Sequence, residues 1–185
     1  MKFQNKFSKS AFTLLIALAI PVLLIACGDS KASEESTYAR IDPIATSFEV
    51  SDFENVGFKV VKEYDIEGLS GATGALHGFH KKNGIDPLSY ELRFYESHTD
   101  AVELGELLAQ EITGEGAVTD SSKMSWTGGK NEQRERATDH GGYAPFYWDY
   151  AIYGNVVILC EGDWPEQSQE ACERIKESLA ATITG

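Results

Sequence analysis

Two adjacent side chains in a glycine-rich stretch could carry acid–base chemistry. Asp139 and His140 directly precede Gly141 and Gly142, so a carboxylate and an imidazole stand next to a backbone that turns easily. A carboxylate beside an imidazole is part of a hydrolytic relay, which also needs a nucleophile. No serine or cysteine lies in a recognisable nucleophile turn. Asp139 and His140 are therefore the candidates for a hydrolase site, which is the alternative to a non-enzymatic function.

A run of aromatic residues follows this stretch and could form a ligand surface. It contains Tyr147, Trp148 and Tyr150, whose rings could stack against a sugar or an apolar molecule. The long polar segment 114–142 leads directly into the run, and a mobile cover beside an aromatic surface can enclose a small ligand. Because aromatic strands are commonly core, the three candidate binding residues have core packing as their alternative.

The remaining polar residues predict no metal site and no cofactor. His77 and His80 are three positions apart in an expected strand, where such residues point to opposite faces, so one ion cannot readily use both. No calcium loop of the Asp-x-Asp-x-Asp-Gly type occurs. The chain carries 16 Lys and Arg against 29 Asp and Glu, a formal charge of −13. This balance argues against nucleic-acid binding, which needs clustered basic residues.

Cys160 and Cys172 are predicted to form a disulfide. Cys160 lies near the end of an expected strand, and Cys172 lies within the expected helix that follows. At strand and helix spacings, both are roughly 10 Å from the turn that joins the two elements. A helix that folds back over its strand therefore brings the two sulfurs level. The alternative is a pair of buried free thiols.

The beginning of the chain has the features of a leader peptide. Three lysines precede an apolar run, 11–26, that is short for a bilayer span of roughly 20 residues. The sequence Leu24-Ile25-Ala26-Cys27 resembles a bacterial lipoprotein lipobox. The resemblance covers only residues 1–28. It implies cleavage before Cys27, a diacylglyceryl group on its sulfur and often a third acyl chain on its amine. Two or three acyl chains hold a protein stably to a membrane.

This resemblance divides the chain into three parts. Residues 1–26 are expected to be a signal peptide, residues 27–40 a lipidated flexible tether, and residues 41–185 a single domain. Removal of the three leader lysines leaves 13 basic and 29 acidic side chains, a formal charge of −16. Such a surface repels anionic headgroups, so the lipid on Cys27 is the expected membrane contact. The expected location is the cell envelope, outside the cytoplasm, and Gly28 allows an outer-membrane destination.

The rest of the chain has the pattern of an α+β domain. Strands are expected over 58–65, 75–82, 88–95, 144–153 and 156–161, with a further one near 133–137. One helix, which Thr99 or Ser97 can cap, has the apolar stripe Ala101, Leu104, Leu108 and Ile112; another runs over about 165–180. Because hairpins dominate, we predict a single antiparallel sheet of five or six strands packed with two main helices.

The turn at Gly154-Asn155 decides how the sheet must be covered. A two-residue turn places Ile152 opposite Val157 and leaves apolar side chains on both faces of the hairpin. Helices on both faces, a helix–sheet–helix sandwich, would then suit the sheet. A three-residue loop would gather the large side chains on one face, and one layer of helices would suffice. The two-residue turn is slightly favoured, and both alternatives stay open.

Together these patterns predict a lipid-anchored protein of the cell envelope whose domain is a non-enzymatic binding or accessory module. The alternative is an envelope hydrolase that uses Asp139 and His140. The expected partners are the membrane, through the lipid on Cys27, and a small ligand or another envelope protein.

Overall fold

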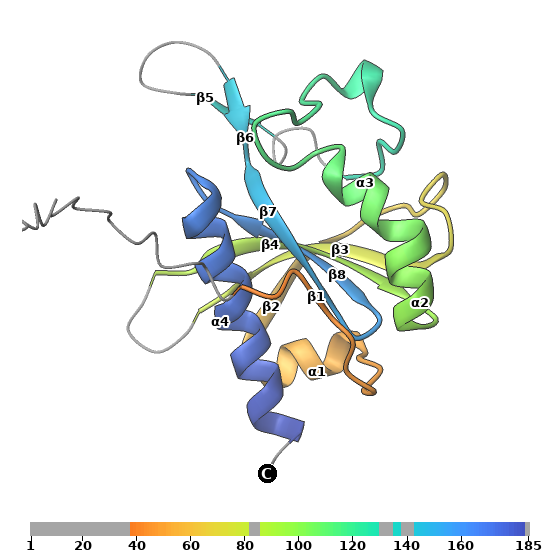
Figure 1. The fold of residues 1–185 in the computed structure, drawn as a ribbon, viewed down its shortest axis with the longest axis vertical. Helices are drawn as coiled ribbons and strands as arrows, with labels where there is room; N and C mark the ends of the chain where they lie inside the picture. Colours follow the sequence, from red (N-terminus) through yellow and green to blue (C-terminus); the bar gives the residue numbers. More distant parts are fainter. Residues whose placement is uncertain (1–37, 82–85, 130–134, 138–142, 184–185) are drawn as a thin grey trace, which may run out of the picture. The chain divides into compact units, whose positions relative to one another are not determined.

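The computed structural model describes residues 38–81, 86–129, 135–137 and 143–183 (Figure 1). In chain order the elements are β1 (Ile41–Asp42), α1 (Val50–Asn55), β2 (Phe58–Glu63), β3 (Ala72–His80), β4 (Leu88–Tyr95), α2 (His98–Asp100), the π-helical segment η1 (Ala101–Gly105), α3 (Glu106–Gln110), the 3-10 turn η2 (Ser121–Lys123), β5 (Glu135–Ala137), β6 (Tyr143–Pro145), β7 (Tyr147–Tyr153), β8 (Val156–Glu161) and α4 (Pro165–Ile183). Within these ranges, no helix is long and apolar enough to cross a membrane.

Six strands form the main sheet, in the order β1-β7-β8-β4-β3-β2, and β5 pairs separately with β6. The neighbours in the main sheet are antiparallel except β1 and β7, where Ile41 pairs with Ile152 and Asp42 with Tyr153 in parallel. The α+β class and a sheet of six strands are as predicted, but the sixth strand is β1, whereas the strand expected near 133–137 pairs separately. The sheet is mixed, so the prediction of a purely antiparallel sheet is wrong. Two residues are too few to show the alternation from which a strand is predicted.

The β7–β8 hairpin has the two-residue turn. Ile152 pairs with Val157 across Gly154 and Asn155, in the register that this turn predicts. Gly154 has φ 57°, a left-handed conformation that glycine adopts without steric cost. The Asn155 side-chain amide donates to two backbone carbonyls outside the hairpin, at 3.2 and 2.9 Å, which holds the turn against its neighbours.

Helices cover both faces of the main sheet (Figure 1). On one face, α1 and α4 contribute the buried side chains of Phe53, Ala171, Cys172, Ile175 and Leu179. On the other face, the segment from η1 onward contributes Ala101, Ala109, Ile112 and Met124. The apolar periodicity of residues 165–180 predicts the four inward positions of α4, Ala171, Cys172, Ile175 and Leu179. Because β4, β7 and β8 are covered on both sides, all side chains but one in each of these strands are buried.

The helix after β4 contains a π-helical segment that changes its buried stripe. Leu104, predicted to face the core, is 38% exposed, and Gly105 is buried in its place. Gly105 rests on the ring of Tyr95, where an added Cβ would lie only 2.7 Å from ring atoms. The prediction for Leu104 is wrong because it assumed 3.6 residues per turn, whereas the wider π turn rotates the following residues.

Candidate functional site

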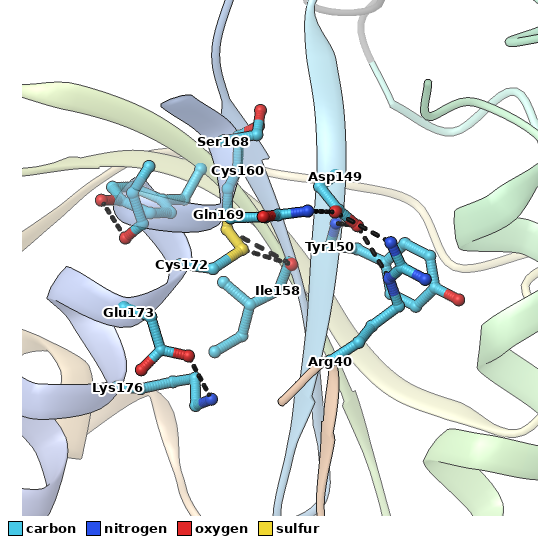
Figure 2. Close-up of a disulfide and its surroundings, with 12 residues drawn as sticks. Arg40, Asp149, Tyr150, Ile158, Cys160, Ser168, Gln169, Cys172, Glu173 and Lys176 are labelled. Carbon is cyan, nitrogen blue, oxygen red and sulfur yellow. Dashed lines mark hydrogen bonds and ion pairs between the residues drawn. A yellow bond between two sulfur atoms is a disulfide. The ribbon is translucent and has the colours of Figure 1, made fainter. Parts of the chain in front are cut away.

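The described chain enters the domain along β1, and its first residues are fastened to β7 (Figure 2). Arg40 donates two hydrogen bonds to the Asp149 carboxylate, from Nε at 2.8 Å and from Nη2 at 2.9 Å. The buried Asp149 also accepts from Gln169 Nε2 at 2.9 Å and from the Tyr150 backbone nitrogen at 2.8 Å. Tyr38 donates to the Tyr150 carbonyl oxygen at 2.5 Å. The segment from Tyr38 to Arg40, which the sequence analysis assigned to the tether, therefore contacts the sheet directly.

A buried ammonium group fastens the same segment to α4. Lys176 Nζ donates to the Ala39 carbonyl oxygen at 3.0 Å and to Glu173 Oε1 at 2.8 Å, and it lies 3.8 Å from Asp42 Oδ2. The ammonium lies 5.5 and 5.7 Å from the centroids of two tyrosine rings, those of Tyr38 and Tyr153. Two carboxylates, a carbonyl and two aromatic faces thus compensate a positive charge that is shielded from water. Figure 2 shows Lys176 and Glu173 side by side on α4.

A recess of about 220 Å³ opens beside Lys176, between α4 and the ends of β1 and β7. Its lining includes Asp42, Tyr153, Glu173 and Glu177. Tyr153 is 5% exposed, and its ring lies 5.7 Å from the Lys176 ammonium. Burial, followed by the negative charges of Asp42 and Glu173, raises the pKa of Tyr153, so the hydroxyl remains protonated. The recess therefore combines carboxylates, an ammonium group and a protonated tyrosine hydroxyl.

A second buried polar group lies on β4, on the face that turns away from α4. Arg93 and Glu91 are both fully buried, and Arg93 Nε donates to Glu91 Oε1 at 2.8 Å while Nη2 lies 2.7 Å from the same oxygen. The guanidinium lies over the ring of Trp126, 4.9 Å from its centroid. Within the described part of the chain, Glu91 Oε2 and Arg93 Nη1 have no hydrogen-bond partner. Because this pair is closed to solvent, neither group can exchange a proton with a substrate.

The two histidines of β3 point to opposite faces of the sheet, as their spacing predicts. His77 stands opposite Glu91 in the register of β3 and β4. His80 Nε2 lies 3.2 Å from the Val56 carbonyl oxygen, and its ring contacts Tyr90 on the α4 face. In the ranges that the structure describes, no group of three or more His, Cys, Asp or Glu is arranged to hold a metal ion.

The domain that carries these features matches one family model. Residues 49–181, well over half of the chain, match a family of unknown function, DUF6810. The chain belongs to the DUF6810 family. No curated protein and no solved structure matches the chain significantly. The range matched to DUF6810 includes Asp149 and Lys176, whereas β1, which these residues fasten, precedes it.

Two of the three predicted binding residues belong to the core of this DUF6810 domain. Tyr147 and Tyr150 are buried in the cluster under α3. Burial raises the pKa of Tyr150 to about 12, and its protonated hydroxyl donates to Glu106 Oε1 at 2.9 Å. Trp148 is only partly buried, so it alone of the three keeps a surface that a ligand could reach. The three rings do not form one open platform.

The predicted hydrolytic pair and the predicted lipidation site lie outside the described residues. Asp139 and His140 fall between β5 and β6, and Cys27 precedes the described part of this DUF6810 chain. The structure therefore adds no geometry to these three predictions.

The residues around the recess were missed by the sequence analysis. Lys176 directly follows Ile175 and lies four residues after Cys172, so it stands on the buried stripe of α4. A charged residue on an apolar stripe is the one local signal that could have identified it. Asp42 has no comparable signal, because the segment around it is unpatterned and its partners are distant in sequence.

Cys160 and Cys172 lie at disulfide-bonding distance, with their Cα atoms 5.6 Å apart (Figure 2). Both are fully buried, and they join β8 to α4. The strand-and-helix spacing in the sequence predicts this proximity.

We expect a Cys160→Ala/Cys172→Ala variant to lose about 3 kcal/mol of unfolding free energy, because the bond closes a short loop in the unfolded chain. Urea unfolding of this variant, compared with the unreduced parent, measures the loss. Both proteins should carry Cys27→Ser, so that no other thiol contributes. Thiol titration of the unfolded, unreduced parent should then find no free thiol, and two thiols per chain would contradict the bond.

Proposed function

We propose that this protein is a lipid-anchored protein of the cell envelope whose folded domain binds a ligand or partner and does not catalyse. The observation that carries the proposal is the fastened N-terminal segment. Arg40 pairs with the buried Asp149, and Lys176 holds the Ala39 carbonyl and Asp42, so a pull on the preceding chain acts on a segment tied to both β7 and α4. Such an attachment suits a domain that is tethered through Cys27.

The cysteine pair supports the extracytoplasmic part of the proposal. Disulfides persist in oxidising compartments and are rare in the cytosol. Cys160 and Cys172 are buried and at bonding distance, and they connect two elements of the core. A domain stabilised in this way suits the location that the lipobox resemblance implies.

The chemistry of the described residues supports binding over catalysis. Glu91 and Arg93 are fully buried and neutralise each other, so they cannot serve a substrate as acid or base. The recess beside Lys176, in contrast, is open and lined by polar side chains. A concave site with a few converging polar groups is the usual form of a small-ligand site. The described residues therefore offer a place where a ligand could bind.

Lipidation of Cys27 is the prediction that tests the anchor. When the chain is expressed from its own leader in a bacterium, we expect it to pellet with membranes, and mass spectrometry should show an acylated N-terminal cysteine. Cys27→Ala should abolish acylation, because the thioether sulfur is then missing. Cys160→Ala is the matched control and should keep the lipid. A membrane-bound protein that still carries residues 1–26, with no acyl group, would contradict the proposal.

A further inference from the structure

We propose that residues 38–42, which we call the strap, dock on β7 and α4 as a unit and undock from them while the rest of the domain stays folded. The strap consists of β1 and the three residues before it. Because Ala39 and Asp42 line the recess beside Lys176, undocking removes part of its wall. This goes beyond the proposed function, because it makes the attachment of the domain to the preceding chain a reversible one.

The strap contributes little to the core. Tyr38 and Asp42 are partly buried, the three residues between them are exposed, and the first buried residue of the described chain is Phe48. Only two residues of the strap pair with β7. Segments with few buried apolar contacts open at a lower free energy than the core. Undocking therefore returns little apolar surface to water.

The buried Asp149, which binds Arg40 of the strap, has other partners in the domain. It accepts hydrogen bonds from Gln169 Nε2 at 2.9 Å and from the Tyr150 backbone nitrogen at 2.8 Å (Figure 2). The Arg40 side chain is 48% exposed even when it is docked, so it passes readily into water. Removal of one partner from a buried ion pair is costly because it leaves a charge without compensation. Asp149 keeps two donors when the strap leaves, which lowers this cost.

Lys176, the second anchor of the strap, also has partners that stay in the domain. Its Nζ donates to the Ala39 carbonyl oxygen of the strap at 3.0 Å and lies 3.8 Å from Asp42 Oδ2. The same ammonium donates to Glu173 Oε1 at 2.8 Å, on its own helix, and lies 5.7 Å from the centroid of the Tyr153 ring. The contacts with Glu173 and Tyr153 persist when the strap leaves, so the ammonium keeps its compensation.

The chain is fixed again directly after the strap, at Phe48. The Phe48 backbone nitrogen donates to Asn155 Oδ1 at 2.7 Å, and its carbonyl oxygen accepts from Asn155 Nδ2 at 3.2 Å. The family match begins at residue 49. These two independent features place the start of the domain at the same point. Undocking of the strap therefore ends at Phe48, and residues 43–47 form the hinge.

Undocking has a consequence for the preceding chain. Five extended residues span roughly 15 Å, which is the length that release of the strap adds to the free chain between residue 27 and the domain. With the proposed lipid on Cys27, the strap would then set both the distance of the domain from the membrane and the opening of the recess. This consequence rests on the proposed function, whereas the undocking itself does not.

Two backbone amides report the docked state directly. The Ile152 nitrogen donates to the Arg40 carbonyl oxygen at 2.7 Å, and the Gly154 nitrogen donates to the Asp42 carbonyl oxygen at 3.3 Å. Both amides lose these acceptors when the strap leaves. The amide of Leu92 is the reference, because its strand β4 is paired on both sides and opens only with the domain.

The test is native-state hydrogen exchange, followed by NMR on the chain from residue 27 onward, produced without its leader and with Cys27→Ser. We expect the amides of Ile152 and Gly154 to be protected at least about a hundredfold less than that of Leu92, because local openings have lower free energies than unfolding. Their exchange should also respond weakly to low urea concentrations, since undocking exposes little surface, whereas exchange at Leu92 should accelerate steeply.

A core variant separates undocking from unfolding. Ile112 is 1% exposed and packs in the cluster on the α3 face, away from the strap. Ile112→Ala should accelerate exchange at Leu92 about a hundredfold, the usual scale for such a truncation. Exchange at Ile152 and Gly154 should not change, because the contacts of Ile112 remain intact when only the strap undocks.

A strap variant tests the anchor. Arg40→Gln removes a half-exposed charge, and we expect it to accelerate exchange at Ile152 and Gly154 about five- to tenfold. Lys123→Gln is the matched control, because the exposed pair of Lys123 with Asp120 lies outside the strap and its anchors. It should leave both amides unchanged. Thermal unfolding of each variant shows that the fold is retained.

Three results would overturn the proposal. The first is equal protection of Ile152, Gly154 and Leu92, and the second is equal acceleration of all three by Ile112→Ala, since each would mean that the strap leaves only when the domain unfolds. The third is unchanged exchange at Ile152 and Gly154 in Arg40→Gln. Because the protein tested has no lipid, such a failure is separate from a failure of Cys27 acylation.

Discussion

An Arg93→Met variant is expected to lose about 3–5 kcal/mol of unfolding free energy, which is the usual cost of removing one partner from a buried ion pair. Arg93 and Glu91 are fully buried on the central strand β4, 2.7 Å apart at their closest atoms. Without the guanidinium, the Glu91 carboxylate stays in the interior with no opposite charge. Urea unfolding measures the loss, with the disulfide intact in every protein compared.

The expected loss is large because water cannot reach the Glu91 carboxylate once Arg93 is removed, and not only because the attraction between the two charges is lost. Glu91 Oε2 has no hydrogen-bond partner among the described residues even in the unaltered chain, so Arg93 is the principal compensation for that charge. The ring of Trp126 covers the guanidinium and keeps water away from the pair. A charge transferred from water into such a site is strongly destabilised unless it is paired.

A double variant separates the effect of charge from that of volume. Glu91→Leu/Arg93→Met removes both charges and retains apolar side chains of moderate size, so we expect it to be more stable than Arg93→Met alone. Lys123→Met is the matched control, because Lys123 makes an exposed ion pair with Asp120 at 3.2 Å. Such pairs contribute at most about 1 kcal/mol. If Arg93→Met cost no more than this control, the pair would not be closed to solvent. If the double variant were as unstable as the single one, lost packing would be the cause.

The elements that could be predicted from the sequence are those whose signal is local. Strand β4 and helix α4 follow clear apolar periodicities, and the Gly154-Asn155 dipeptide specifies the turn from which the pairing of Ile152 with Val157 follows. The approach of Cys160 to Cys172 could be predicted because each lies a similar distance from the turn between β8 and α4.

The features that escaped prediction depend on contacts between distant parts of the chain. Strand β1 is two residues long and is held by Asp149 and Lys176, more than a hundred residues away. The π turn places Gly105 against the ring of Tyr95, and a regular helical periodicity cannot indicate such a turn. Glu91 and Arg93 alternate with apolar residues, which is also the pattern of a strand with one solvent-exposed face. Their burial follows from the second layer of helix and loop.

The candidate site could not be predicted for the same reason. The recess is assembled from β1, the end of β7 and α4, and its residues are a weak signal in each element taken alone. The aromatic run was the predicted ligand surface instead, yet a strand covered on both faces needs large apolar side chains on both faces. Tyr147 and Tyr150 meet this need on the α3 side of β7.

Tyr147→Ala is therefore expected to lose about 3–5 kcal/mol of unfolding free energy, the range for large aromatic residues removed from a core. The Tyr147 side chain is fully buried, and its ring packs edge-to-face on Phe146 with centroids 5.1 Å apart. Deletion of the ring leaves a cavity that the neighbouring backbone cannot readily close, since Tyr147 is paired with Glu161 of β8 and bridged to Thr113.

Trp148→Ala provides the contrast in the neighbouring residue. Trp148 is only partly buried, so less apolar surface returns to water, and we expect a loss of about 1–2 kcal/mol. Urea unfolding of both variants under identical conditions gives the comparison. A Tyr147→Ala variant as stable as Trp148→Ala would mean that the Tyr147 ring is not core, and the proposal of an aromatic ligand surface on β7 would return. If Tyr147→Ala loses more unfolding free energy than Trp148→Ala, the Tyr147 ring is core. Trp148 is then the residue at which a ligand surface is to be tested, because its side chain can be removed without unfolding the domain.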